Sequence, residues 1–180
     1  MMTKIILEIP DKVYKTVWFH LLPKKFLAEE AAFIFAQRIT EDGINMFRCL
    51  DWSPVPPHGF LTRSRFYLEL ANETRAAAIK RAHDLGASLV ELHSHYGLWP
   101  AQFSESDLFG FKEFVPHIWW RLKNRPYMAI VVSKSGFDGL AWISDPKTAN
   151  YIDGIVSGGL EFAPTKLSRI RDDLYDVRTL

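Results

Sequence analysis

The hydrophobic pattern along the chain first predicts its strands. The segment "KIILEI" alternates apolar and polar positions, and "AFIFAQRI" is rich in β-forming residues. The tetrapeptide "TEDG" (40–43) then has the composition of a hairpin turn. Taken together, these patterns predict strands over residues 4–9, 31–39, 44–52, 65–70 and 88–95, and a second hairpin over 127–143.

Helical patterns fall between these strands. Apolar residues at helical spacing predict a first helix over 11–22. The range 72–87 is Ala-rich, opens on Asn72 as a candidate N-cap and ends at a glycine. A third helix is predicted to begin at Ser104 and to bend or break near Pro116. The order β-α-β-β-β-α-β-α-β-β predicts an α/β fold in which helices flank a single mixed sheet.

Composition and charge narrow the classes of function. The 22 Lys and Arg residues nearly balance the 21 Asp and Glu residues, which argues against a phosphate-binding surface, so we expect no nucleic-acid partner. No apolar run approaches the ~18 residues of a membrane span, and residues 1–15 do not resemble a signal peptide. Cys49 is the only cysteine, so an internal disulfide and a CxxC zinc knuckle are both excluded. We therefore expect a cytoplasmic protein without a membrane partner.

The segment "VELHSHYGLWPAQFSESD" (90–107) carries the clearest candidate chemistry. On a strand, His93 and His95 point to the same face, about 6–7 Å apart along the chain. An open zinc site needs a third ligand, which Asp107 can supply from the first turn of the next helix. The alternative is structural: the histidines are unrelated strand residues, and Ser104-x-x-Asp107 is only a capping box.

The stretch "HSHYGLWPAQFSESD" resembles the JAMM signature of the JAB/MPN metallopeptidases. That signature has an upstream Glu, then HxH, seven residues and SxxD. Here eight residues separate His95 from Ser104, and Tyr96 stands where the family commonly has Pro. The resemblance implies that His93, His95 and Asp107 bind Zn²⁺ and that Ser104 lines the oxyanion site. It also implies the three-layer fold that MPN domains share with cytidine deaminases.

The family's catalytic Glu lies far upstream of the signature. The segment "AEEAAFIFA" (28–36) resembles the family's segment, and matching the two places Glu29 on the catalytic Glu. Two alternatives remain open for the base. Glu30 is adjacent to Glu29 on the chain, and Glu91 shares the face of His93. Glu91 could instead orient an imidazole by accepting its N–H.

The resemblance implies a zinc-dependent isopeptidase that hydrolyses the amide bond after the C-terminal tail of ubiquitin or a ubiquitin-like protein. Because the chain is short, it resembles the compact prokaryotic members of the family. The expected metallopeptidase-like domain covers 1–150, and 151–180 form a C-terminal extension that is helical over "KLSRIRDDLYDVR" and packs on the domain. Two alternatives are an inactive MPN scaffold that binds other proteins and a zinc hydrolase of small amides. The sequence leaves the oligomeric state open.

Overall fold

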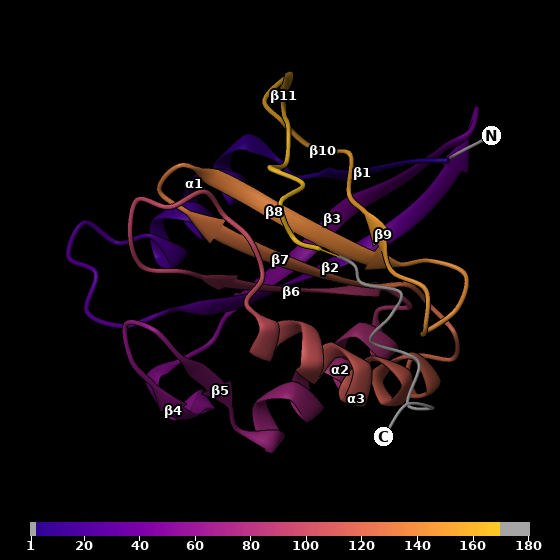
Figure 1. Cartoon of the computed structure of the whole chain (residues 1–180). Coiled ribbons are helices and arrows are strands. Elements are labelled where there is room, and N and C mark those ends of the chain that lie inside the picture. Colours follow the sequence, from indigo (N-terminus) through magenta and orange to yellow (C-terminus); the bar gives the residue numbers. More distant parts are fainter. Residues whose placement is uncertain (1–2, 170–180) are drawn as a thin grey trace, which may run out of the picture.

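The computed structural model describes residues 3–169, in which a mixed sheet carries helices on both faces (Figure 1). The strands are β1 (Lys4–Glu8), β2 (Ala31–Glu41), β3 (Ile44–Pro54), β4 (Phe60–Arg63), β5 (Leu68–Leu70), β6 (Ser88–Ser94), β7 (Tyr127–Ser133), β8 (Gly136–Trp142), β9 (Asn150–Tyr151), β10 (Gly154–Ser157) and β11 (Leu160–Phe162). The helices are α1 (Asp11–Leu21), the short 3-10 helix η1 (Pro57–Gly59), α2 (Asn72–Asp84) and α3 (Glu105–Arg121). Among the described helices, none combines the length and the apolar character needed to cross a membrane.

The main sheet of the described chain has nine strands in the order β11-β10-β1-β3-β2-β6-β7-β8-β9, and β4 and β5 form a separate hairpin. Strand β6 lies in the interior of this sheet, next to the middle strand β2, and is antiparallel to β2 and parallel to β7. The predicted α/β class with a large mixed sheet flanked by helices is therefore confirmed, but the strand predicted over 65–70 lies outside this sheet, in the separate hairpin. Strand β6 carries His93, and His95 follows directly after its last residue.

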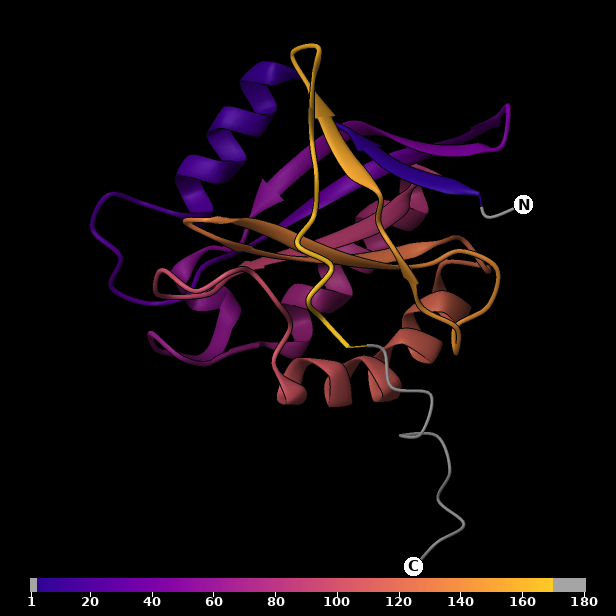
Figure 2. The same cartoon turned by 45° about the horizontal axis from the view of Figure 1, so that its top comes forward.

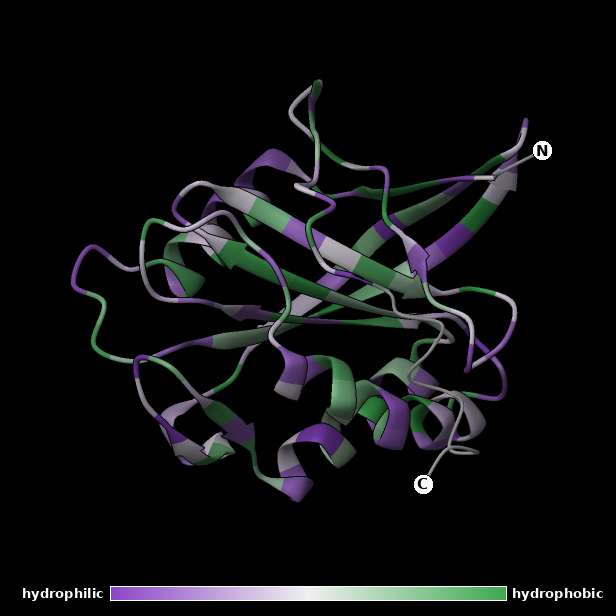
Figure 3. Ribbon diagram, in the orientation of Figure 1, coloured by the Kyte–Doolittle hydropathy of each residue, from purple (hydrophilic) through white to green (hydrophobic). Residues whose placement is uncertain are grey.

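The sheet separates two hydrophobic cores. One packs under α2 and α3 and includes Leu89 of β6, and the other packs under α1 and includes Val90 and Leu92 of the same strand. Figure 2 shows α1 on one side of the sheet and α2 and α3 on the other. Every residue of β6 and β7 is buried; β7 is apolar over most of its length and green in Figure 3, whereas β6 places the polar side chains of Glu91 and His93 on the face covered by α2 and α3.

Two local predictions need correction. Asn72 is the first residue of α2 rather than its N-cap; the cap is Ala71, which makes no side-chain capping bond. Helix α3 is not broken at Pro116 but continues to Arg121. Proline removes one backbone hydrogen bond from a helix interior at a cost of ~3 kcal/mol. Burial of neighbouring apolar residues of α3 against the sheet offsets this cost.

Residues 151–169 differ from the predicted helical extension. They contain β10, which pairs in parallel with β1, and β11, which pairs with β10, so this part of the chain extends the main sheet. Most of the predicted C-terminal helix, 166–178, lies outside the described residues. Residues 163–169, here called the C-terminal strap, follow β11 and pass along the sheet towards the beginning of α3, drawn in yellow in Figure 2.

Candidate metal centre

His93 and His95 lie at the end of β6, where neighbouring strands fix the backbone on both sides. The amide of Ser94 donates to the carbonyl of Glu30 at 2.9 Å, and the amide of His95 donates to the carbonyl of Val132 at 2.8 Å. Strand geometry therefore continues one residue beyond β6. Both imidazoles point to the face covered by α3, as the alternation of the sequence predicts.

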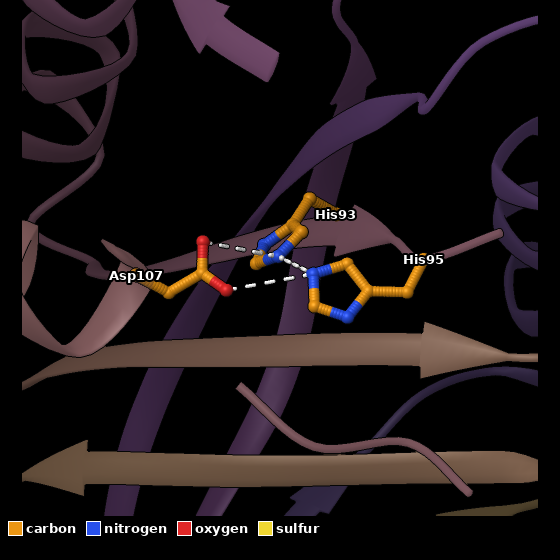
Figure 4. A group of neighbouring side chains, drawn as sticks. All are labelled: His93, His95 and Asp107. Carbon is orange, nitrogen blue, oxygen red and sulfur yellow. Dashed lines mark hydrogen bonds and ion pairs between the residues drawn. The ribbon is translucent and has the colours of Figure 1, made fainter. Parts of the chain in front are cut away.

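The structure brings these two histidines together with Asp107 in a group that could hold a metal ion, here called the metal triad (Figure 4). The Nε2 atoms of His93 and His95 are 3.1 Å apart. The carboxylate oxygens of Asp107 lie 3.6 Å from Nε2 of His93 and 3.4 Å from Nε2 of His95. Zinc–ligand bonds of about 2.05 Å at tetrahedral angles place ligand atoms about 3.3 Å apart, so the donor set fits such an ion.

Asp107 is held in place by the start of α3. Ser104 is the N-cap, and its hydroxyl accepts from the amide of Asp107 at 3.2 Å and donates to Oδ2 of Asp107 at 2.6 Å. The amide of Ser104 donates to the same oxygen at 2.8 Å. The capping box is therefore present, but it is compatible with metal binding, because a carboxylate has about four lone-pair sites. The structural and the chemical interpretations of this motif are not alternatives.

The electrostatics of the site keep Asp107 ionised. Burial is the largest single influence and raises its pKa. The charge of His93 and hydrogen bonds from His93, His95 and Ser104 together outweigh burial and hold the pKa of Asp107 well below its usual range. An ionised carboxylate beside two imidazoles is the form in which all three side chains can bind a cation.

Glu29 lies just before β2, opposite the end of β6. The register pairs Ala31 with His93, and continuing it by two residues places Glu29 opposite His95. The residue is 4% exposed and lines the same cleft as the metal triad. Burial raises its pKa to about 7; nearby His95 opposes this rise and Asp107 adds to it. Within the described residues, the Glu29 carboxylate makes no hydrogen bond or ion pair.

The two alternative carboxylates are already engaged. Glu91 lines the cleft, but Arg75 binds it through two hydrogen bonds of 2.9 and 3.2 Å, and the hydroxyl of Tyr127 donates to it at 3.2 Å. Glu30 forms an ion pair with Arg63 at 2.6 Å. Neither acid accepts from a metal-triad imidazole. Of the three candidates, Glu29 alone is both in the cleft and without a partner.

The cleft around the metal triad has a volume of about 730 Å³ and runs between the β4–β5 hairpin and α3. Phe103 is buried beneath it, with its ring centroid 5.9 Å from that of His93. Trp99 is 83% exposed and lies at the cleft with Phe66 and Phe109, which are also exposed. The centre therefore combines a buried carboxylate with an open, aromatic rim.

Neither the role of Arg75 nor β4 was predicted from the sequence, and the strand predicted over 65–70 is shorter and pairs with β4 as β5. Arg75 follows the start of α2 by one turn, and nothing in its local pattern distinguishes it from a surface arginine. Its guanidinium also lies over the ring of Phe114, 4.4 Å from the ring centroid. The hairpin contacts the site through Ser64, whose carbonyl accepts from the amide of Glu29 at 2.7 Å. The one feature of the sequence that could have indicated the role of Arg75 is the charge of Glu91, because an acidic residue on a buried strand needs a cation packed against it.

No protein-family model and no curated protein sequence matches the chain. The chemistry of the centre is therefore inferred from its own geometry and from the motif that builds it.

Proposed function

We propose that the protein is a zinc-dependent isopeptidase of the JAB/MPN type, which hydrolyses the amide bond after the C-terminal tail of ubiquitin or a ubiquitin-like protein. The observation that carries the proposal is a buried, unpartnered Glu29 beside two imidazoles and one carboxylate in an open cleft. The helices on both faces of the sheet are compatible with the MPN arrangement. We also propose a cytoplasmic location, since a chain with the single cysteine Cys49 uses no internal disulfide.

The proposed mechanism follows from the positions of the side chains. A zinc ion, when bound, supplies a Lewis acid that lowers the pKa of water to ~7. Glu29 takes a proton from the attacking water and passes it to the departing amine as the carbon–nitrogen bond breaks. Burial raises the pKa of Glu29, which makes it a stronger base than an exposed carboxylate and suits both transfers. The products are the carboxylate of the tail and a free amine, so the reaction needs water and no other reactant.

In this mechanism Ser104 has a second role besides capping α3. Its hydroxyl lies beside Asp107 at the cleft, where it can turn to donate to the substrate carbonyl oxygen as that oxygen gains charge. Loss of one such donor lowers turnover by about 10²-fold. Loss of an N-cap side chain costs ~1 kcal/mol of stability.

We therefore expect Ser104→Ala to remain folded at 25 °C and to turn over substrate about 10²-fold more slowly. Steady-state kinetics and a thermal melt measure the two effects separately. Asp145→Ala serves as a control, because it also removes a side chain that accepts hydrogen bonds from nearby backbone amides. The carboxylate of Asp145 accepts from the amides of Lys147 and Thr148 at 2.8 and 2.9 Å. A Ser104→Ala enzyme with a lowered Tm and an unchanged rate would leave capping as the only role of Ser104.

The shape of the cleft supports an extended peptide as the substrate. Strand β5 lines the cleft and pairs only with β4 among the described strands, so a peptide can lie beside it and bind through main-chain hydrogen bonds. Trp99 and the buried Phe103 both line the cleft that contains the metal triad. We propose that small residues next to the cleaved bond pass these two rings more easily than bulky ones. The Gly-rich tail of a ubiquitin-like protein has that property.

The substrate class is tested with a ubiquitin-like fusion and a matched fusion whose penultimate Gly is changed to Val. We expect zinc-loaded enzyme to cut the first fusion at least about 10-fold faster, because a branched side chain adds steric conflict of ~1–3 kcal/mol in a tight site. A metal chelator should stop both reactions. Equal rates on the two fusions, or hydrolysis of a small amide with neither fusion cut, would contradict the isopeptidase proposal and favour a small-amide hydrolase.

A further inference from the structure

The C-terminal strap is hydrogen-bonded to the loop that connects the two histidines of the metal triad to the helix that carries Asp107. This loop, residues 95–104, begins with His95 and ends with Ser104, the N-cap of α3. From the strap, the hydroxyl of Thr165 donates to the carbonyl of Ala101 at 2.5 Å. The amide of Phe103 donates to the hydroxyl of Ser168 at 2.8 Å. A segment more than 50 residues later in the sequence thus holds the backbone next to Ser104.

Asp138 on β8 fixes the strap in turn. Its side chain is fully buried, and its carboxylate accepts from the amide of Ser168 at 2.8 Å and from the amide of Lys166 at 3.1 Å. It also accepts from the amide of Gly139 at 2.9 Å. The hydroxyl of Tyr151 donates to the carbonyl of Ser168 at 2.6 Å. Ser168 is thereby bonded through its amide, its carbonyl and its hydroxyl, so the position of that hydroxyl is determined by the sheet.

Phe103 connects this arrangement to the metal triad in two ways. Its ring is buried and tilted by 46° against the ring of His93, with the centroids 5.9 Å apart. Its backbone leads directly into Ser104, whose amide and hydroxyl hold the carboxylate of Asp107. Displacing Phe103 would therefore move His93, against which its ring packs, and would also move Asp107, which is held by the start of α3.

We propose that Ser168 and Asp138 are positioning residues for the metal centre. They hold Phe103, and through it the first turn of α3, at the distance at which Asp107 meets the two imidazoles. The proposal rests on the proposed metal-dependent function. Residues 96–104 form no helix or strand, so they have few other backbone bonds to fix them. A metal site is sensitive to such support, because its ligands must be held to within ~0.5 Å.

The test compares Ser168→Ala with Asp153→Asn in the full-length protein. Asp153 provides a matched control, because it bonds the same strap through the side chain of Lys166 at 3.0 Å and bonds β1 through the amide of Ile5 at 2.9 Å. It makes no bond to the loop. Zinc dissociation constants are measured by competition with a chelator of known affinity, together with Tm after metal removal.

We expect Ser168→Ala to weaken zinc binding by about 10-fold, the lower end of the effect of residues that support a ligand from outside the coordination sphere. Asp153→Asn should bind zinc as tightly as the wild type does, even if its Tm falls as far as that of Ser168→Ala. A Ser168→Ala protein with wild-type affinity overturns the positioning role alone. Equal weakening in both variants also overturns it, since the effect would then follow general stability. A wild-type protein that binds no zinc overturns the proposed function and this role together.

Discussion

Replacing Glu29 with glutamine should lower turnover by about 10²–10⁴-fold while zinc content and fold remain those of the wild type. Glutamine preserves the size of the side chain but cannot take a proton from water. The Glu29 carboxylate makes no hydrogen bond or ion pair within the described residues, so its replacement by the amide breaks no such contact there. Steady-state kinetics on zinc-loaded protein and metal analysis of the same sample measure the two quantities.

Glu30→Gln is the matched control for this prediction. It removes the adjacent carboxylate, whose ion pair with Arg63 is part of the fold rather than of the cleft. We expect its turnover to stay within about 3-fold of the wild type, because the Glu30–Arg63 pair does not line the cleft and the amide oxygen of Gln can still accept from Arg63. If Glu29→Gln turns over normally and Glu91→Gln does not, Glu91 would be the base.

The pH dependence of turnover follows from the state of the same carboxyl. A general base acts when it is ionised, so the rate should rise with pH through the pKa of Glu29. Burial raises that pKa to about 7 in the metal-free protein. A bound cation favours the ionised form and lowers the pKa, so the rising limb should lie at or below pH 7 and should be absent in Glu29→Gln.

Replacing His95 with alanine should remove zinc and abolish turnover. The remaining two side chains offer one imidazole and one carboxylate, which leaves half of a tetrahedral site open to water. The side chain of His95 is only partly buried, so the fold should tolerate its loss. Metal analysis after dialysis and a kinetic assay measure the outcome.

His117→Ala provides the control for that variant. His117 is an exposed residue of α3, the helix that carries Asp107, but it does not line the cleft. It should retain zinc and wild-type turnover. Full zinc occupancy in His95→Ala would show that the metal triad is misassigned, and activity without zinc would contradict the proposed chemistry.

Elements that are specified locally could be predicted from the sequence. The alternation in β1, the strand pattern over β6 and the capping box of α3 each contain their own signal, and all three are present in the structure. The strand predicted over 65–70 is present in part as β5, whereas β4 and β10 had no such signal. Strand β10 pairs Gly154 with Ile6 of β1, and so large a separation along the chain leaves no local pattern.

The same distinction applies to the candidate site. His93, His95 and Asp107 lie in one short segment, where strand alternation and the first turn of a helix were enough to identify them as candidates. Choosing among three glutamates depended on contacts between remote segments. Arg75 comes from α2 and neutralises Glu91, and only the register between β2 and β6 places Glu29 beside His95. These contacts exist only in the folded chain.

X-ray absorption at the zinc edge would show directly whether the metal triad binds zinc. The spectrum of the wild type should correspond to about one zinc per chain with nitrogen and oxygen ligands at ~2.0–2.1 Å, of which two are imidazoles, and no sulfur ligand at ~2.3 Å from Cys49. In Asp107→Ala, the zinc should be lost or its spectrum should change. A wild-type protein without zinc, or a zinc spectrum that is the same in wild type and Asp107→Ala, would show that His93, His95 and Asp107 do not form a zinc site.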